Sequence, residues 1–319
     1  MKAAALGVLT VLTIFISLFF GAADINPAQA LQALFGQGTE THRLIINELR
    51  LPRALLGAVI GAGLGASGAA LQGYTRNPLA APGILGFSAC AALGAVTALY
   101  FGRSAWVPVA ALLGTTLGAL LILTLAGPRK SASTLILAGV GVGALATALT
   151  GLIMNFAPNP WALSEIIYWL MGSLKNAEMN SLMICAPLTF IGFIALLVIG
   201  PDLKTLSLGE DTAQSLGVSL GKVRALLIAG VALCVGSGAI AGAIGFIGLF
   251  IPHIIRLIFG PDPLRLIPLS ALGGAGFLVF ADIITRTQTG PGTQLYLGIL
   301  TSLIGVPFFL YLAVKEART

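Results

Sequence analysis

Apolar stretches of about 20 residues recur along nearly the whole chain, and each is long enough to cross a bilayer as a helix. This pattern constrains the fold more than any other feature. Of the 319 residues, 57% are hydrophobic and only 9% are charged. So few charges cannot cover a water-facing surface of this size, which excludes a soluble enzyme, a disordered tail and a disulfide-stapled secreted domain. We expect an all-α, polytopic membrane protein.

The apolar runs define about ten transmembrane spans, so we expect all of 1–319 to form one transmembrane domain. The first run is longer than the core of a signal peptide, and we expect it to be retained although Ala28-Gln29-Ala30 resembles a cleavage site. The eighth run is short enough to be a broken helix. The expected spans cover residues 4–22, 53–74, 84–101, 106–126, 133–155, 181–200, 223–242, 244–259, 266–285 and 295–314.

The basic residues lie singly between apolar runs, so the net charge of +6 indicates membrane topology rather than nucleic-acid binding. If the N-terminus is cytoplasmic, eleven of the 17 Lys and Arg residues fall on the cytoplasmic side and six on the outer side. This bias predicts that both termini are cytoplasmic. The six outer residues are Arg43, Arg50, Arg53, Arg103, Lys175 and Arg286.

The second and seventh spans open in the same way. Arg53-Ala-Leu-Leu begins one and Arg224-Ala-Leu-Leu the other, and both continue into runs rich in Gly, Ala and Ser. The two spans lie five apart, so a duplicated half would be inverted, as in many transporters. The alternative is that helices rich in small residues simply resemble one another. A fold of two inverted five-helix halves is therefore one of two interpretations of this similarity.

Four glycines in the second span, Gly57, Gly61, Gly65 and Gly68, recur at helical spacings of three and four residues. Small residues at this spacing let helix backbones approach closely in a membrane. The pattern predicts tight helix packing and identifies no substrate.

The chain shows no set of residues that would carry catalysis or bind a metal. Cys90, Cys185 and Cys234 lie in apolar runs without a metal-site or disulfide spacing, and we interpret them as small buried hydrophobes. The two histidines, His42 and His253, are far apart in the sequence. No cofactor or metal is expected, and an intramembrane enzyme has no residues to support it.

Asp282 is the one carboxylate well inside an expected span, which makes it a functional candidate by default. Arg286 follows four residues later, so an ion pair within one helix explains both residues. The alternative is that Asp282 carries protons in a secondary transporter.

The chain lacks a nucleotide-binding loop of its own. Gly217-Val-Ser-Leu-Gly221-Lys222-Val223 has three residues between its glycines instead of four, and Val follows the Lys. If ATP drives this protein, a partner must therefore supply the ATPase.

Residues 201–222 form the longest polar segment on the expected cytoplasmic side. Ser207 and Glu210 have the spacing of a capping box, and Gly217 is suited to end a helix. The segment therefore predicts a short helix over 208–216.

One edge of this short helix would be apolar, with Leu208 and Leu216 docking on a partner. Glu210, Asp211 and Gln214 would face water or that partner. The alternative is an ordinary surface helix, but its length and capping in a chain with few loops favour a docking element. On the opposite side, Arg50 and Arg53 flank Leu51-Pro52 and would bind lipid headgroups or an acidic partner.

Several motifs resemble a known family, the FecCD-type membrane permeases of ATP-binding-cassette importers for iron–siderophores, haem and cobalamin. They occur in family order over nearly the whole chain. The motifs are Arg50-Leu-Pro-Arg53, Asn77-Pro-Leu-Ala-Ala-Pro82-Gly-Ile-Leu-Gly86, Leu208-Gly-Glu-Asp-Thr-Ala-Gln-Ser-Leu-Gly217, Gly242-Ala-Ile-Gly-Phe-Ile-Gly-Leu-Phe-Ile-Pro252-His253, Ala281-Asp282 and Gly298-Ile-Leu-Thr-Ser-Leu-Ile-Gly-Val-Pro307.

The resemblance implies ten helices in a prokaryotic cytoplasmic (inner) membrane. It implies a second copy or a homologous permease as partner, and two cytoplasmic ATP-binding subunits that use ATP and Mg. A periplasmic or lipid-anchored substrate-binding protein would deliver a bulky metal chelate. An iron–siderophore is the expected cargo, with haem or cobalamin as the alternative.

The resemblance also implies roles for particular segments. Residues 207–217 would be the coupling helix in a groove of the ATPase, and Arg50, Arg53 and Arg286 would meet acidic residues of the binding protein. The pathway would run along the dimer axis, bordered in part by 135–155. Near Gln294 the family usually has Glu, and near Tyr296 it usually has Pro, so the outer loop before the last span departs from the family pattern.

Overall fold

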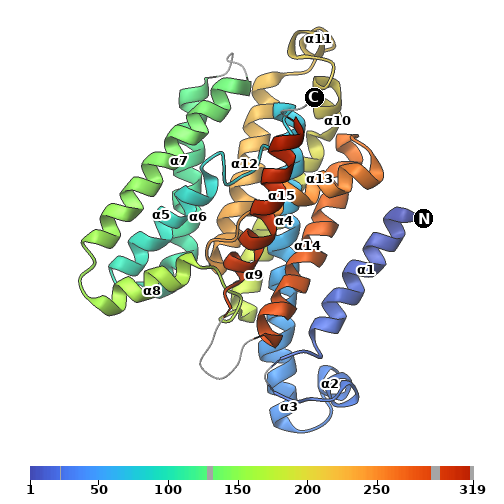
Figure 1. Ribbon diagram of the computed structural model, residues 1–319, viewed down its shortest axis with the longest axis vertical. Coiled ribbons are helices and arrows are strands. Elements are labelled where there is room, and N and C mark those ends of the chain that lie inside the picture. Colours follow the sequence, from blue (N-terminus) through green and yellow to red (C-terminus); the bar gives the residue numbers. More distant parts are fainter. Residues whose placement is uncertain (22, 128–131, 289–294, 317–319) are drawn as a thin grey trace.

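The computed structural model describes residues 1–21, 23–127, 132–288 and 295–316, and within these ranges every regular element is a helix. Figure 1 shows long helices that run side by side and alternate in direction. The all-α membrane fold predicted from the sequence is confirmed. In chain order the helices are α1 Lys2–Ser17, α2 Pro27–Leu34, α3 Glu40–Leu44, η1 Ile45–Arg50, α4 Leu51–Thr75, α5 Phe87–Tyr100, η2 Ser104–Trp106, α6 Val107–Ala126, α7 Ala132–Asn155, α8 Pro160–Leu170, α9 Met179–Val198, α10 Gly200–Leu206, α11 Glu210–Ser215, α12 Leu220–Gly238, η3 Ala239–Ala241, α13 Ile247–Phe259, α14 Pro263–Thr287 and α15 Leu297–Glu316.

Each expected span corresponds to a helix among the described residues. Six helical segments are long and apolar enough to cross a membrane, and α1, α5, α13 and α15 supply shorter apolar helices. The eighth span is the short α13, which begins after Phe246 in a left-handed conformation with φ of 65°. The short eighth run in the sequence therefore marks a break in the backbone.

Several short helices outside the spans were not predicted. α2 begins with Asn26 and Gln29 in a reciprocal capping box, and α8 begins with the Asn159 side chain accepting from the backbone N–H of Ala162. Both helices have Pro in the first turn, where a missing N–H costs nothing. An Asn-Pro pair is therefore the sequence signal for both helices, and the length of apolar runs does not reveal it.

The helix α4 lies at the centre of the bundle and is mostly buried. A Cβ added at Gly61 would meet the backbone carbonyl of Gly274, and one added at Gly65 would meet that of Ser270, both on α14. A Cβ at Gly68 would meet the carbonyl of Gly248 on α13. These glycines therefore bring three backbones into direct contact.

The fourth glycine of the series has a different neighbour. A Cβ at Gly57 would lie 3.0 Å from a methyl carbon of Leu174, in the segment between α8 and α9. It would also lie 3.6 Å from a methyl carbon of Val279 on α14. This glycine therefore makes room for side chains rather than for a backbone.

The two halves of the chain match in an inverted sense. α4 and α12 run in opposite directions (Figure 1). In each half the following helix begins at a left-handed residue, Gly86 before α5 and Phe246 before α13. A Cβ added at Gly143 on α7 would meet Gly86, and one added at Gly305 on α15 would meet Phe246. The equivalent breaks pack on equivalent helices, which favours the inverted repeat over chance similarity.

We expect Gly65→Ala to disrupt the fold, because the added methyl group would overlap the Ser270 carbonyl. Overpacking of this kind typically costs about 1–3 kcal/mol. The measurement is thermal unfolding of the purified protein in detergent, with Gly151→Ala as control, because nothing lies within 4 Å of a Cβ at that position on α7. Equal unfolding temperatures for the two variants would contradict the assigned contact.

Candidate functional site

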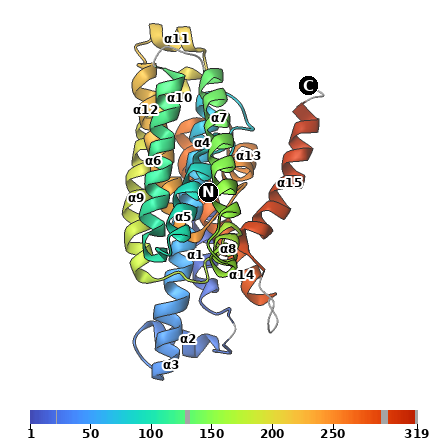
Figure 2. The same cartoon turned by 90° about the vertical axis from the view of Figure 1, so that its left-hand side faces the viewer.

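The short helix α11 projects from one end of the molecule (Figures 1 and 2). It covers Glu210–Ser215, so it begins two residues later than the expected 208. Leu208 and Leu216 flank it and are 63% and 64% exposed. Ala213, in contrast, is fully buried against the bundle. The segment thus presents two large apolar side chains outward while one small residue anchors it.

The predicted capping box is wrong. Ser207 Oγ donates to the backbone carbonyl of Lys204 at 2.6 Å, which places Ser207 at the end of α10. The N-cap of α11 is Gly209, whose φ of 111° separates Ser207 from the helix, and Glu210 is the first helical residue. A turn of this kind needs Gly, and the spacing rule for a capping box takes no account of it.

The end of α11 matches the sequence pattern in geometry. Gly217 has φ of 91°, and its N–H donates to the carbonyl of Gln214 at 2.9 Å. The N–H of Val218 donates to the carbonyl of Ala213, also at 2.9 Å. The left-handed residue therefore stops the helix and turns the chain into α12. Asp211 and Gln214 are exposed on the same helix, and Glu210 is half-buried.

Three arginines expected to contact a partner gather at the opposite end of the bundle, around Asp282. Arg53 donates to both carboxylate oxygens of Asp282, with Nη2 at 2.7 Å and Nε at 2.9 and 3.1 Å. Arg286 pairs with the same carboxylate at 3.1 Å, so the expected pair within one helix forms. We call Arg50, Arg53, Asp282 and Arg286 the outer ionic cluster, after the side on which the sequence predicts these arginines to lie.

The pairing of Arg53 with Asp282 was not predicted. The two residues lie 229 positions apart, and the only available signal was their opposite charge at the same expected membrane depth. The Asp282 carboxylate is almost completely buried, so two cations neutralise it in a low-dielectric site. This ion pair therefore holds α4 against α14.

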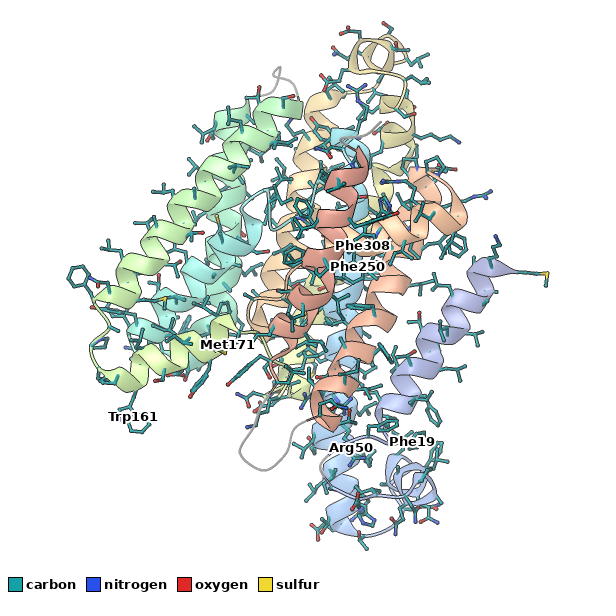
Figure 3. All side chains as sticks on the ribbon, in the orientation of Figure 1. Phe19, Arg50, Trp161, Met171, Phe250 and Phe308 are labelled. Atoms are coloured by element: carbon teal, nitrogen blue, oxygen red, sulfur yellow. The ribbon has the colours of Figure 1, made fainter. Side chains whose placement is uncertain are left out.

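The other two arginines, Arg50 and Arg286, bind backbone carbonyl groups of this chain. Arg50 is 5% exposed and donates to the carbonyls of Leu18 at 2.9 Å and Ala23 at 2.6 Å. Figure 3 shows Arg50 where α4 meets the segment after α1. Arg286 donates to Ser17 and to the carbonyl of Phe20. Only Arg53 keeps 18% of its side chain exposed, so docking by these residues remains a prediction.

A cavity of about 1030 Å³ opens beside α8, at the end of the bundle that carries the outer ionic cluster. Tyr168, Tyr296 and Glu165 are among the residues that line it. The Tyr168 and Tyr296 rings are parallel, with centroids 6.1 Å apart. Tyr296, near which a departure from the family pattern is expected from the sequence, supplies one ring of this stack. Gln294, the other departure, lies outside the described residues.

The cysteines and histidines do not come together into one site. Cys90, Cys185 and Cys234 are buried and carry free thiols. His253 packs edge-on against Phe308 with ring centroids 5.5 Å apart, whereas His42 lies on α3, at the end of the bundle that carries the outer ionic cluster. Within the described ranges no group of three or more His, Cys, Asp or Glu could hold a metal ion.

The comparisons with known proteins agree on one family. The model of the FecCD transport family matches residues 9–315. The cobalamin import system permease protein BtuC of Halobacterium salinarum is 41% identical over 86% of this chain and 74% of its own length. The iron(3+)-hydroxamate import system permease protein FhuG of Bacillus subtilis is 36% identical over 96% and 94%.

A solved structure shows the same arrangement of helices. It is described as an inward-facing conformation of a metal-chelate type ABC transporter, and it is 31% identical to this chain. The match has a TM-score of 0.88 and covers 98% of this chain and 99% of that one. The chain belongs to the FecCD transport family.

Proposed function

We propose that this chain is the membrane-spanning permease subunit of an ATP-binding-cassette importer that carries a bulky metal chelate into the cytoplasm. The observation that supports it most is the projecting α11, beside which Leu208 and Leu216 are exposed, in a member of this family. The one candidate nucleotide-binding loop in the sequence lacks the required spacing, so a partner would have to bind the ATP. Two ATP-binding subunits would hold α11 and hydrolyse ATP with Mg. The α11 end then faces the cytoplasm, with both termini on that side.

A second permease is the proposed partner within the membrane. Figure 2 shows α15 standing apart from the rest of the bundle. Large apolar side chains on it are exposed, among them Leu303 at 65% and Leu310 at 58%. On α7, Leu137 is 74% exposed. A second copy or a homologous permease against this side would place the pathway between the two subunits, bordered in part by 135–155.

The outer partner is proposed to be a periplasmic or lipid-anchored binding protein. It would dock at the end that carries the outer ionic cluster, where Arg50, Arg53 and Arg286 outnumber Asp282. A carboxylate of the binding protein would reach Arg53 first, because Arg53 keeps more of its side chain exposed than Arg50 or Arg286 does. Opposite charges across an interface set orientation and speed of association more than affinity.

The proposed cargo is an iron–siderophore complex, and the alternative is haem or cobalamin. The relatives support the chelate class, since their names include cobalamin, iron-hydroxamate and iron-citrate permeases. The test is uptake of labelled chelates into proteoliposomes that hold the permease, the ATPase and the binding protein. Uptake must need ATP, and vesicles with this chain alone must accumulate nothing. Accumulation by the chain alone would overturn the proposal.

We expect Gly217→Val to uncouple ATP hydrolysis from uptake. A β-branched residue at φ of 91° is strained by about 1–3 kcal/mol, and shifting α11 relieves that strain. Uptake per ATP should then fall about tenfold, the change that ~1.4 kcal/mol brings. Gly217→Asn is the control, because Asn tolerates the left-handed region. Unchanged uptake per ATP in Gly217→Val would count against α11 as the coupling element.

The variant Asp282→Asn separates this proposal from proton-coupled transport. It leaves Arg286, which is buried, and Arg53, which is partly buried, without their shared counter-charge. We therefore expect the free energy of unfolding to fall by about 3–5 kcal/mol. The folded fraction should still take up cargo and stop when ATP is depleted. Asp202→Asn is the control, because that carboxylate makes none of the ion pairs found in the described ranges.

A folded Asp282→Asn complex that hydrolyses ATP but moves no cargo would favour the proton carrier instead. Thermal unfolding and uptake must be measured on the same preparation, so that loss of folded protein is not mistaken for loss of transport.

A further inference from the structure

A buried arginine lies in the helix that follows α11, the proposed coupling helix. Arg224 is in the first turns of α12 and is only 2% exposed. Four residues separate the end of α11 from the start of α12. With so short a connection, a displacement of α11 reaches the first turn of α12 directly.

Arg224 joins three membrane-spanning helices at this end of the bundle. Its Nε donates to the hydroxyl of Tyr74 on α4 at 2.8 Å, and its Nη1 donates to the carbonyl of Gly127, which ends α6. The guanidinium carbon lies 6.0 Å from the centre of the Tyr74 ring. We call Tyr74 and Arg224 the inner clamp.

The inner clamp lies in the protein interior. Tyr74 itself is 4% exposed, so the phenol lies in a medium where charges act strongly. The four-residue connection between α11 and α12 is therefore the link between α11 and the clamp.

A neighbouring contact extends the clamp to α13. Gln72, two residues before Tyr74, accepts from Arg256 Nη2 at 2.8 Å and donates to the carbonyl of Leu249 at 3.1 Å. Both partners lie on α13. The last turn of α4 is thus bonded directly to α12 and α13, and Arg224 links it onward to the end of α6.

Resting on the proposed function, we infer that Tyr74 is a positioning residue for transport, which transmits movement of α11 to the core helices through its hydroxyl bond to Arg224. A buried guanidinium cannot leave its acceptors cheaply, because its donors would lose their hydrogen bonds without gaining water. Movement of α11 must therefore carry α4 and α12 with it. Without the phenol oxygen, α12 can shift while α4 stays.

The test is Tyr74→Phe in the complete importer, reconstituted with the ATPase and the binding protein. This variant keeps the ring and removes the hydroxyl. We expect ATP hydrolysis to persist while the amount of chelate taken up per ATP falls about tenfold. Tyr100→Phe is the control, because Tyr100 is the last residue of α5, away from the inner clamp, and its ring packs edge-on against Phe101. A purely structural role would lower hydrolysis and uptake together and leave their ratio unchanged.

A second variant shows whether the bond itself matters. Arg224→Lys keeps the positive charge but replaces the planar guanidinium group, so one cation can no longer donate in the same fixed directions to Tyr74 and Gly127. If one contact carries the effect, the double variant Tyr74→Phe, Arg224→Lys should have the same uptake per ATP as either single variant. Independent roles would multiply the two losses and overturn the inference. A Tyr74→Phe complex that cannot be assembled also counts against it, because the contact is then only structural.

The two proposals fail in different ways. If Gly217→Val leaves uptake per ATP unchanged, α11 is not the coupling element and the proposed function loses its main support. If Gly217→Val uncouples the importer but Tyr74→Phe does not, the inner clamp alone is refuted.

Discussion

The direct contact of α4 with its neighbours through glycine is the constraint on which the rest of the structure depends. Lipid chains are as apolar as leucine, so helices in a membrane gain little by hiding apolar surface from each other. Close packing must supply the attraction, and Gly61, Gly65 and Gly68 allow it by placing backbone against backbone. Because α4 touches α14 and α13 in this way, the polar groups at its two ends are brought to fixed partners.

Polar contacts at both ends of α4 then fix its position relative to the neighbouring helices. The outer ionic cluster ties one end to α14, and the inner clamp with Gln72 ties the other to α12, α6 and α13. The outer ionic cluster and the inner clamp correspond under the inverted repeat, because Arg53 and Arg224 open equivalent helices. Each of these arginines binds near the end of the fourth span of the other half. Neither half is therefore complete without the other.

The sequence predicted what depends on local pattern. Apolar run length predicted the spans, and glycine spacing predicted close helix contact. The pairing of Asp282 with Arg286 followed from a four-residue spacing. Pairing of Arg53 with Asp282 could not be read in this way, since it depends on three-dimensional packing across most of the chain. The start of α11 was misplaced because the local turn at Gly209 overrode a capping pattern that Ser207 and Glu210 otherwise satisfy.

The long separation between Arg53 and Asp282 has a consequence for how the protein is made. A ribosome delivers α4 well before α14, so Arg53 must enter the membrane while its carboxylate does not yet exist. An unpaired guanidinium is costly in hydrocarbon, and a long side chain near a helix end escapes that cost by reaching the interface. The Arg53 side chain is therefore held at the interface until α14 has been inserted. Its pairing with Asp282 then joins the first-made half to the last.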